Sequence, residues 1–334
     1  GFVLLSVFVN TITIVVMKFL DPSEGIDIES IGGQINIDSN STLIGVAEMI
    51  RKIAFYIVPE NFVNSLIQNN VMGTLVIVCF IAKNMAAFSK TKGIKSFQSF
   101  IDISLSSVKE MLFPILLMTP FGVFSILCVQ MVKTKDLMIF FRMSNYYFVY
   151  LIANTIFMLF LISIQILLIR WEFFVYAKKL IKPTLKGFAI ASSAAVLPEI
   201  IDSISENNES ENKAIFFLSL ANTLQKTSTN IYFMVTVNFV TKVMGKPLSL
   251  TGQIILAAIN IPMTMACPPV PMASAVYLGI FVQLFDLKMT PIMLSLFIAA
   301  DPLMDRLQTF FNVCGNFLLY KICLSFSKWW DRRK

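Results

Sequence analysis

Long apolar segments separated by short polar ones make up most of this chain of 334 residues. A helix that crosses a bilayer needs about 20 mainly apolar residues, and candidates are residues 1–20, 71–88, 110–132, 146–169, 214–240 and 290–326. Apolar residues make up 56% of the chain and charged residues 14%, against about 25% charged in soluble domains. The pattern predicts an all-α integral membrane protein with several spans.

The net charge is +7, and most Lys and Arg residues lie near the ends of the apolar segments and do not form one basic face. Basic residues cluster at residues 83–95, 178–186 and 328–334, whereas residues 21–48 carry acidic residues and no basic one. Cytoplasmic loops carry the excess of Lys and Arg. We therefore expect a protein of the plasma (inner) membrane with a cytoplasmic C-terminus, in contact with lipid and not with nucleic acid.

Few kinds of catalytic chemistry fit this composition. The chain has no His, and its five Cys are dispersed through apolar segments without paired spacing. This excludes His-dependent hydrolysis and His-ligated metals, and it disfavours a disulfide framework. No phosphate-binding glycine motif is present. We expect no enzyme, no organic cofactor and no metal site that can be assigned.

The C-terminal half differs, because polar or Pro-rich clusters interrupt its apolar segments at residues 191–195, 223–229 and 267–271. Irregular backbone at membrane depth is tolerated only inside protein or beside a water-filled cavity, and broken helices are typical of secondary transporters. We predict a multi-span bundle with two re-entrant helical hairpins, at about residues 178–212 and 248–285. Two ligand-binding helices, at about 213–243 and 290–327, complete the expected inverted repeat.

A polar stripe marks the last long segment. At about 100° per residue, its members fall within roughly 80° of one another on a helix, and they are Asp301, Asp305, Gln308, Asn312 and Asn316. Polar residues can simply join helices in a membrane. Five on one face, two of them acidic, favour a ligand path, because ionisable groups at this depth are costly.

Four further residues allow more than one interpretation. Arg306 either extends to the interface or neutralises a nearby Asp, or it sets the charge of a site. Lys226 either extends to the interface, pairs with Asp301 or Asp305, or places its ammonium group where a cation would otherwise bind. Ser192, with Ser193, either caps a turn or lets a ligand approach free amide groups at the tip of the first hairpin.

With these segments identified, the chain resembles the glutamate/neutral amino-acid transporter family, the sodium–dicarboxylate symporters. The matching motifs are Ile57-Val58-Pro59 with Asn61, Pro120 to Phe124, Ser192-Ser193 with Leu197-Pro198, and Asp305-Arg306-Leu307 with Thr309, Asn312, Val313 and Gly315. The resemblance implies an elevator-type fold, a homotrimer and the absence of the family's first two helices. It also implies scaffold, trimerisation and outer transport helices in residues 1–176 and a transport core in residues 177–334.

The resemblance also implies a substrate site. Asp305 would bind the amino group of an amino acid and Asn312 its main-chain carboxylate. The pocket would be lined by Ser193, Thr229, Val270 and Thr309. Gln308 stands where members with acidic substrates have an Arg, and a neutral amide cannot form that charge-assisted pair with a side-chain carboxylate. A small neutral amino acid is the expected substrate.

The cation sites of the family are altered in this chain. The positions concerned are Ser6, Thr223, Gln225, Lys226, Thr227, Cys267, Asn312 and Asn316. Thr227 and Asn316 replace family carboxylates, and Lys226 adds an ammonium group. Since sodium prefers oxygen ligands with net negative charge, we expect sodium coupling to be altered or lost, with sodium or a proton as the coupling ion.

The sequence therefore favours secondary active transport of a small neutral amino acid. A non-transporting substrate sensor, a symporter of dicarboxylates or acidic amino acids, and an anion channel on the same scaffold remain as alternatives.

Overall fold

The computed structural model describes residues 2–24, 51, 55, 58–59, 61–67, 71–88, 92–134, 143–169, 172–204, 208–267, 269, 273–285 and 291–331. Every regular element among these residues is a helix, which confirms the all-α prediction for this part of the chain. The chain forms two compact units, residues 1–43 with 134–334 and residues 44–133. Each unit is described by itself below.

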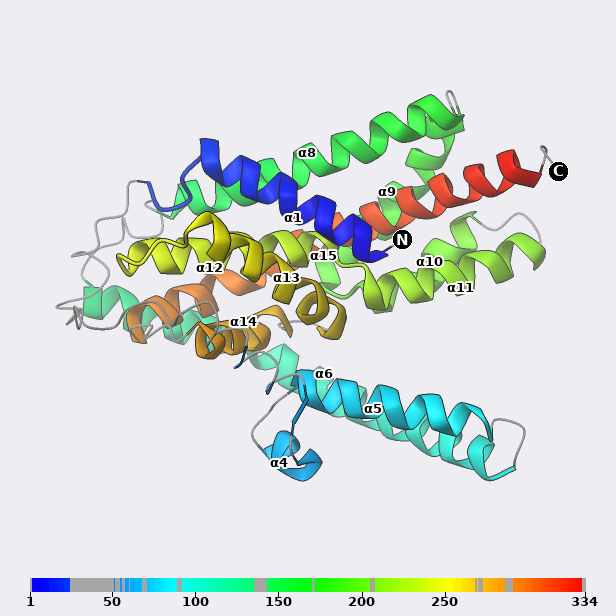
Figure 1. Ribbon diagram of the computed structural model, residues 1–334, viewed down its shortest axis with the longest axis horizontal. Helices are drawn as coiled ribbons and strands as arrows, with labels where there is room; N and C mark the ends of the chain where they lie inside the picture. The colour runs from blue at the N-terminus through cyan, green and yellow to red at the C-terminus, as the bar shows by residue number, and fades with distance from the viewer. Residues whose placement is uncertain are drawn as a thin grey trace. The chain divides into compact units, whose positions relative to one another are not determined.

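The smaller unit contains α4 (Phe62–Ile67), α5 (Val71–Ala86) and α6 (Lys92–Thr134) (Figure 1). Asn61 caps α4, since its side-chain oxygen accepts from the backbone N–H of Val63 at 2.9 Å. α4 packs against α5. Large apolar side chains are exposed on the long helix, among them Phe100 and Phe121, as expected for a helix that faces lipid or another apolar surface.

The larger unit is built around α12 (Thr227–Val243), whose side chains are almost all buried. Figure 1 shows α12 in the middle of this unit, and it packs against five other helices. These are α1 (Phe2–Phe19), α8 (Ser144–Ile169), α13 (Leu250–Ala266), α14 (Ala273–Leu284) and α15 (Pro291–Asp331). The remaining helices are α9 (Glu172–Ile190), α10 (Ser193–Ile204) and α11 (Asn208–Leu224).

Local capping chemistry sets the boundary between α12 and α13. Gly245 adopts a positive φ of 68°, and the backbone N–H of Lys246 donates to the carbonyl of Thr241 at 2.8 Å. This arrangement closes the C-terminal end of a helix, and glycine adopts it without strain. Ser249 then caps α13, because its hydroxyl accepts from the backbone N–H of Gly252 at 3.2 Å.

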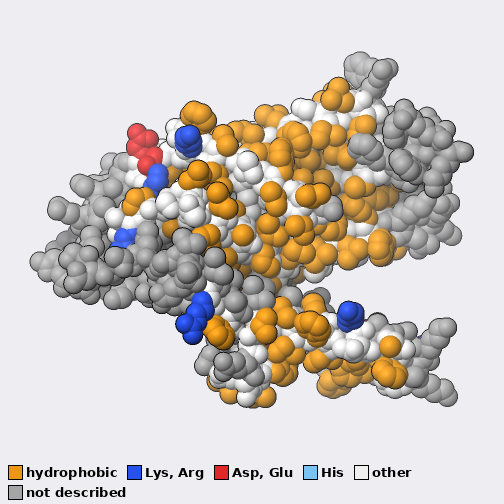
Figure 2. All heavy atoms as spheres, viewed as in Figure 1, with side chains coloured by type: hydrophobic (Ala, Val, Ile, Leu, Met, Phe, Trp, Pro, Cys, Tyr) orange, Lys and Arg blue, Asp and Glu red, His pale blue; other side chains and the backbone are white. Residues whose placement is uncertain are grey.

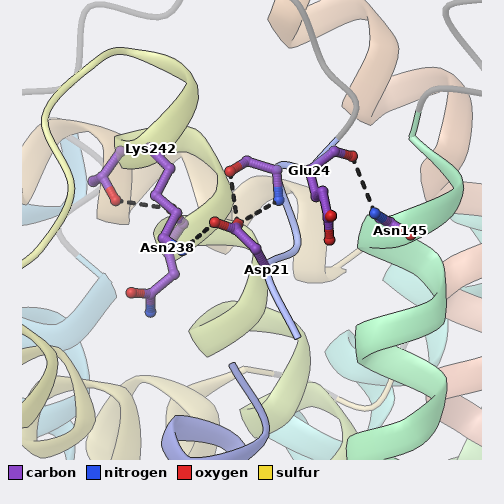
Figure 3. A network of polar contacts seen from close by, with 7 residues as sticks. Asp21, Glu24, Asn145, Asn238 and Lys242 are labelled. Atoms are coloured by element: carbon purple, nitrogen blue, oxygen red, sulfur yellow. Dashed lines mark hydrogen bonds and ion pairs between the residues drawn. The ribbon is translucent and has the colours of Figure 1, made fainter. Parts of the chain in front are cut away.

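A polar network joins three helix ends of the larger unit (Figure 3). Lys242, in the last turn of α12, forms an ion pair with Asp21, just after α1, at 2.8 Å. Asn145, in the first turn of α8, donates to the backbone carbonyl of Glu24 at 3.1 Å. Burial acts to raise the pKa of Asp21, but hydrogen bonds from Lys242 and Ser23 outweigh burial and hold the pKa below its ordinary value.

The surface of the larger unit is apolar over much of its length. Figure 2 shows hydrophobic side chains along its helices, with charged side chains toward one end. Among the described residues, α1 over Phe2–Phe19 and α8 over Ser144–Leu168 are long and apolar enough to cross a bilayer. Exposed apolar side chains on these two helices, such as Leu4 and Leu167, suit a lipid-facing surface.

Several predicted segment bounds differ from those of the helices. The first hairpin was predicted from residue 178, but α9 begins at Glu172 and α10 ends at Ile204. α11 begins at Asn208, ahead of the predicted residue 213, because its first turn is polar and gives no apolar signal. The compact units also group α1 and α8 with the C-terminal half, since both helices pack on α12. The functional boundary at residue 176 stays a prediction.

Candidate functional site

The site is centred on the interruption between α11 and α12. α11 ends at Leu224 and α12 begins at Thr227, and Lys226 has φ −116° and ψ 73°. A break of this kind leaves carbonyl groups of α11 and N–H groups of α12 without partners in their own helices. These backbone groups are available to bind side chains or a ligand at the site.

The buried ammonium group of Lys226 binds backbone carbonyls at the ends of two helices. It is 4% exposed, and its Nζ donates to the carbonyl of Thr223 at 3.0 Å, in the last turn of α11. It also donates to the carbonyl of Cys267, the C-cap residue directly after α13. Helix C-termini carry partial negative charge, so the ammonium group lies where two helix dipoles favour a cation. An ion pair with Asp301 or Asp305 was one of the alternatives for Lys226, and the contacts given for Lys226 among the described residues are these two carbonyls instead.

Asn312 of α15 forms hydrogen bonds with polar groups in the first turn of α12. Its side-chain oxygen accepts from the backbone N–H of Ser228 at 2.9 Å, and its amide nitrogen donates to the Thr229 hydroxyl at 3.1 Å. Asn312 and Thr229 are 5% and 4% exposed. The structure therefore brings these two predicted pocket residues together at the N-terminus of a broken helix, where an anionic group is favoured.

The segment between α9 and α10 contacts the segment that follows α13. Ala191, between α9 and α10, has a positive φ of 55°, which is strained for a residue other than glycine. Ser192 follows it, and its hydroxyl donates to the carbonyl of Pro269 at 3.3 Å. The same oxygen accepts from the backbone N–H of Ala195 at 3.4 Å, so Ser192 also caps α10.

Ser193 and Thr309 lie on neighbouring helices of the same region. Ser193 begins α10 and is buried, and Thr309 is buried on α15. A Cβ atom added to Gly187 of α9 would lie 3.5 Å from the Thr309 methyl group and 3.3 Å from Val196 of α10. The small residue at 187 therefore lets α9 approach α10 and α15 closely.

The N-terminal part of the polar stripe forms hydrogen bonds with α14. The Gln308 amide donates to the Ser274 hydroxyl at 3.2 Å, and that hydroxyl donates to Asp301 Oδ1 at 3.3 Å. Asp301 is fully buried, and among the described residues its Oδ2 has no hydrogen-bond partner. Asp305, one turn further on, is 7% exposed.

Arg306 does not neutralise these carboxylates in the described structure. Its Nη1 donates to the carbonyl of Pro302, one turn earlier in α15, at 2.6 Å, and the side chain is half-buried. Val270, predicted to line the pocket, lies outside the described residues.

The other predicted cation-site positions are mostly buried. Ser6 on α1 and Asn316 on α15 are 4% and 6% exposed. The Thr227 hydroxyl lies 3.3 Å from a Cβ atom added to Gly315. Gln225 is 1% exposed, and neither atom of its amide has a partner among the described residues. Thr223 contributes its carbonyl, while its own side chain is exposed.

Several polar residues of this region were missed from the sequence. Tyr150 of α8 shares a hydrogen bond of 2.6 Å with the Ser228 hydroxyl. Asn260 of α13 donates to Asn10 of α1 at 3.1 Å and to the side chain of Asn230 of α12 at 2.9 Å. Lone asparagines inside apolar segments were the available signal, but no sequence pattern pairs residues 10, 230 and 260.

The arrangement suits binding of a small zwitterion. Buried hydroxyl and amide groups surround the start of α12, and acidic side chains lie on the same face of α15. In the described part of the chain, no group of three or more His, Cys, Asp or Glu residues could hold a metal ion.

Comparison with known proteins identifies relatives. A sequence model of the sodium:dicarboxylate symporter family matches residues 1–323. Human excitatory amino acid transporter 2 is 26% identical over 251 residues, which cover 74% of this chain and 43% of that protein. An excitatory amino acid transporter of Caenorhabditis elegans is 23% identical over 264 residues, which cover 78% of this chain and 51% of that protein. Mouse excitatory amino acid transporter 3 is 26% identical over 253 residues, which cover 74% of this chain and 47% of that protein. The chain thus spans about half the length of the curated relatives it matches.

Proposed function

Because the chain belongs to the sodium:dicarboxylate symporter family of integral membrane proteins, we propose that it carries a small amino acid across the membrane by secondary transport. The family membership confirms the resemblance inferred from the sequence. The proposal includes an elevator mechanism with re-entrant hairpins, a homotrimer, and a cytoplasmic C-terminus in the plasma (inner) membrane. It draws support from the match over residues 1–323 and from the names of the relatives.

The substrate in this proposal is a neutral amino acid. Asp305 receives the amino group, while Asn312, Thr229 and the start of α12 receive the main-chain carboxylate. Gln308 faces the substrate side chain with an amide that already donates to Ser274. A substrate with a side-chain carboxylate would have no guanidinium group to pair with at this position. A neutral side chain carries no charge that needs such a partner.

The cation is built into the protein in this proposal. The observation that carries it is the Lys226 ammonium group, held by the carbonyls of Thr223 and Cys267 in a buried site. Backbone carbonyls at the ends of unwound or broken helices are the ligands that transporters offer to sodium. A tethered ammonium group that occupies them removes the need for sodium and favours exchange of one amino acid for another.

A substrate sensor that does not transport is the second candidate. Two contacts hold α13 on α12: the bond from Lys226 to Cys267 and the bonds from Asn260 to Asn230. If these contacts never break, the second hairpin cannot open as a gate. A symporter of dicarboxylates or acidic amino acids is the third candidate, favoured by the name of the family.

The test is uptake by the full-length protein in proteoliposomes, with a panel of labelled amino acids. Each is tried with a sodium gradient, with a proton gradient, and with unlabelled amino acid inside and no gradient. We expect sodium-independent exchange of a neutral amino acid, abolished by Asp305→Asn and retained in the exposed control Asp202→Asn. Sodium-driven uptake of glutamate or aspartate would favour the third candidate, and binding without flux in folded protein would favour the sensor.

A further inference from the structure

Tyr150 of α8 and Ser228 of α12 form a buried pair of hydroxyl groups at the start of α12. Their oxygen atoms are 2.6 Å apart, and both residues are 0% exposed. Ser228 lies in the first turn of α12, directly after the break that separates it from α11. A side-chain hydrogen bond therefore joins α8 to the turn at which the proposed site for the substrate carboxylate begins.

Ser228 is held from two sides. Its backbone N–H donates to the side-chain oxygen of Asn312 on α15 at 2.9 Å, while its hydroxyl is paired with Tyr150 on α8. The main chain and the side chain of one residue thus connect α12 to two different helices. Because both bonds end on Ser228, they fix the first turn of α12 relative to Asn312.

The three helices approach one another closely in this region. A Cβ atom added to Gly315 of α15 would lie 3.2 Å from Met158 of α8 and 3.3 Å from the Thr227 hydroxyl of α12. The Tyr150 ring also packs edge-on against Tyr232 of α12, with the ring centroids 6.5 Å apart. A ring held by packing directs its hydroxyl to one position, so Tyr150 offers Ser228 a partner of fixed geometry.

Exposed fractions separate the groups that can touch a ligand from those that support them. Asn312 is 5% exposed, Thr229 4% and Asp305 7%, whereas Tyr150 and Ser228 are 0% exposed. A side chain without accessible surface acts on a ligand only through its neighbours. The hydroxyl of Tyr150 therefore affects the site through Ser228.

We infer that Tyr150 is a positioning residue for the substrate carboxylate, acting through Ser228 on Asn312 and on the N–H groups at the start of α12. This role rests on the proposed function, because it concerns the carboxylate site of that proposal. Donors already held in the geometry that a ligand needs lose less freedom when it binds. Without Tyr150, the Ser228 hydroxyl would bond to nearby backbone groups, as serine side chains do, and the first turn would lose its fixed position.

A second bond of the same kind in the same pair of helices provides a matched control. Tyr146, about one turn earlier on α8, shares a hydrogen bond of 2.8 Å with Thr236, about two turns further along α12. Both residues are buried. Tyr146→Phe therefore removes the same kind of bond between α8 and α12 away from the break.

The first test is exchange of labelled alanine, serine and glutamine by the full-length protein in proteoliposomes. We expect Tyr150→Phe to raise KM about three- to tenfold with the maximal rate unchanged, which corresponds to about one hydrogen bond. Ser228→Ala should raise KM similarly, and adding Tyr150→Phe to Ser228→Ala should raise it no further. Tyr146→Phe should keep the KM of the wild type.

Two results of this test would overturn the positioning role. One is an unchanged KM in Tyr150→Phe. The other is an equal rise in Tyr150→Phe and Tyr146→Phe, since a general loosening of α8 against α12 would then explain both.

The second test needs no substrate. Tyr150→Phe and Asn312→Ala each remove a bond to Ser228, so their effects on thermal unfolding of the purified protein should be non-additive. The effects of Tyr146→Phe and Asn312→Ala should add. Additive effects of Tyr150→Phe and Asn312→Ala would contradict the positioning role. If folded protein neither binds nor exchanges any amino acid, the proposed function fails, and the unfolding comparison still decides whether Tyr150 and Asn312 act on each other through Ser228.

Discussion

Replacing Lys226 by Met tests whether its ammonium group stands in for a bound cation. Met fills most of the same volume but leaves the carbonyls of Thr223 and Cys267 without their donor. Each buried acceptor left unsatisfied costs about 1–3 kcal/mol. The loss is offset in part because the burial cost of an ammonium group also disappears. We expect Lys226→Met to be less stable by about 2–4 kcal/mol in sodium-free buffer.

Sodium should then restore the stability of the variant. The carbonyls that Lys226 releases become available as oxygen ligands at the ends of two helices. A ligand at about 100 times its dissociation constant stabilises the folded state by about 2.7 kcal/mol. We therefore expect sodium to raise the unfolding temperature of Lys226→Met and to leave that of the wild type unchanged.

The assay is thermal unfolding of purified protein in sodium and in choline chloride at equal ionic strength. Lys186→Met is the matched control, because the Lys186 side chain is 53% exposed and pairs with Glu199 on the surface. Such a pair contributes about 0–1 kcal/mol, and no sodium response is expected. Equal stabilisation of wild type and Lys226→Met by sodium would refute the reasoning, since the ammonium group would then not occupy the cation position.

Three further predictions follow from individual contacts. Asn260→Ala removes the bonds to the buried Asn230 side chain and backbone carbonyl and should lower the free energy of unfolding by about 1–3 kcal/mol, measured by thermal unfolding. Burial acts to raise the pKa of Asp21, but hydrogen bonds led by that from Lys242 hold the pKa below its ordinary value of 3.8. The pair of Asp21 with Lys242 therefore stabilises the protein above pH 3.8, and this contribution disappears as the pH falls through the lowered pKa. It is under about 1 kcal/mol, because the Asp21 side chain is 44% exposed. Comparing unfolding of wild type and Asp21→Asn against pH measures this. Gln308→Arg supplies a guanidinium group for a side-chain carboxylate, so aspartate should begin to compete with the neutral substrate in an uptake assay.

The sequence located the interruptions of the larger unit but not the contacts made there. The polar cluster at residues 223–229 predicted a break, and the chain leaves helical geometry at Gln225 and Lys226. The Ser192-Ser193 pair predicted a turn, and Ser192 lies between α9 and α10 while Ser193 is the first residue of α10. These features are local, so composition and spacing along one segment suffice to find them.

The partners of Lys226 could not be predicted in the same way. Its acceptors are two backbone carbonyls, one of them 41 residues away, and every residue type carries a carbonyl. The interpretation as an ion pair with Asp301 or Asp305 relied on charge alone, and the helix ends proved to be the partners. Ser274 went unnoticed for a similar reason, since a single serine in an apolar helix gives no sign of the carboxyl group that it faces.

The most direct test of the central claim is the movement of radioactive sodium with the amino acid in proteoliposomes of the full-length protein. If Lys226 takes the place of the cation, substrate exchange proceeds at the same rate in choline as in sodium, and no sodium crosses with the substrate. Sodium entering in fixed proportion to the amino acid would contradict the account, because a cation site would then persist beside the ammonium group.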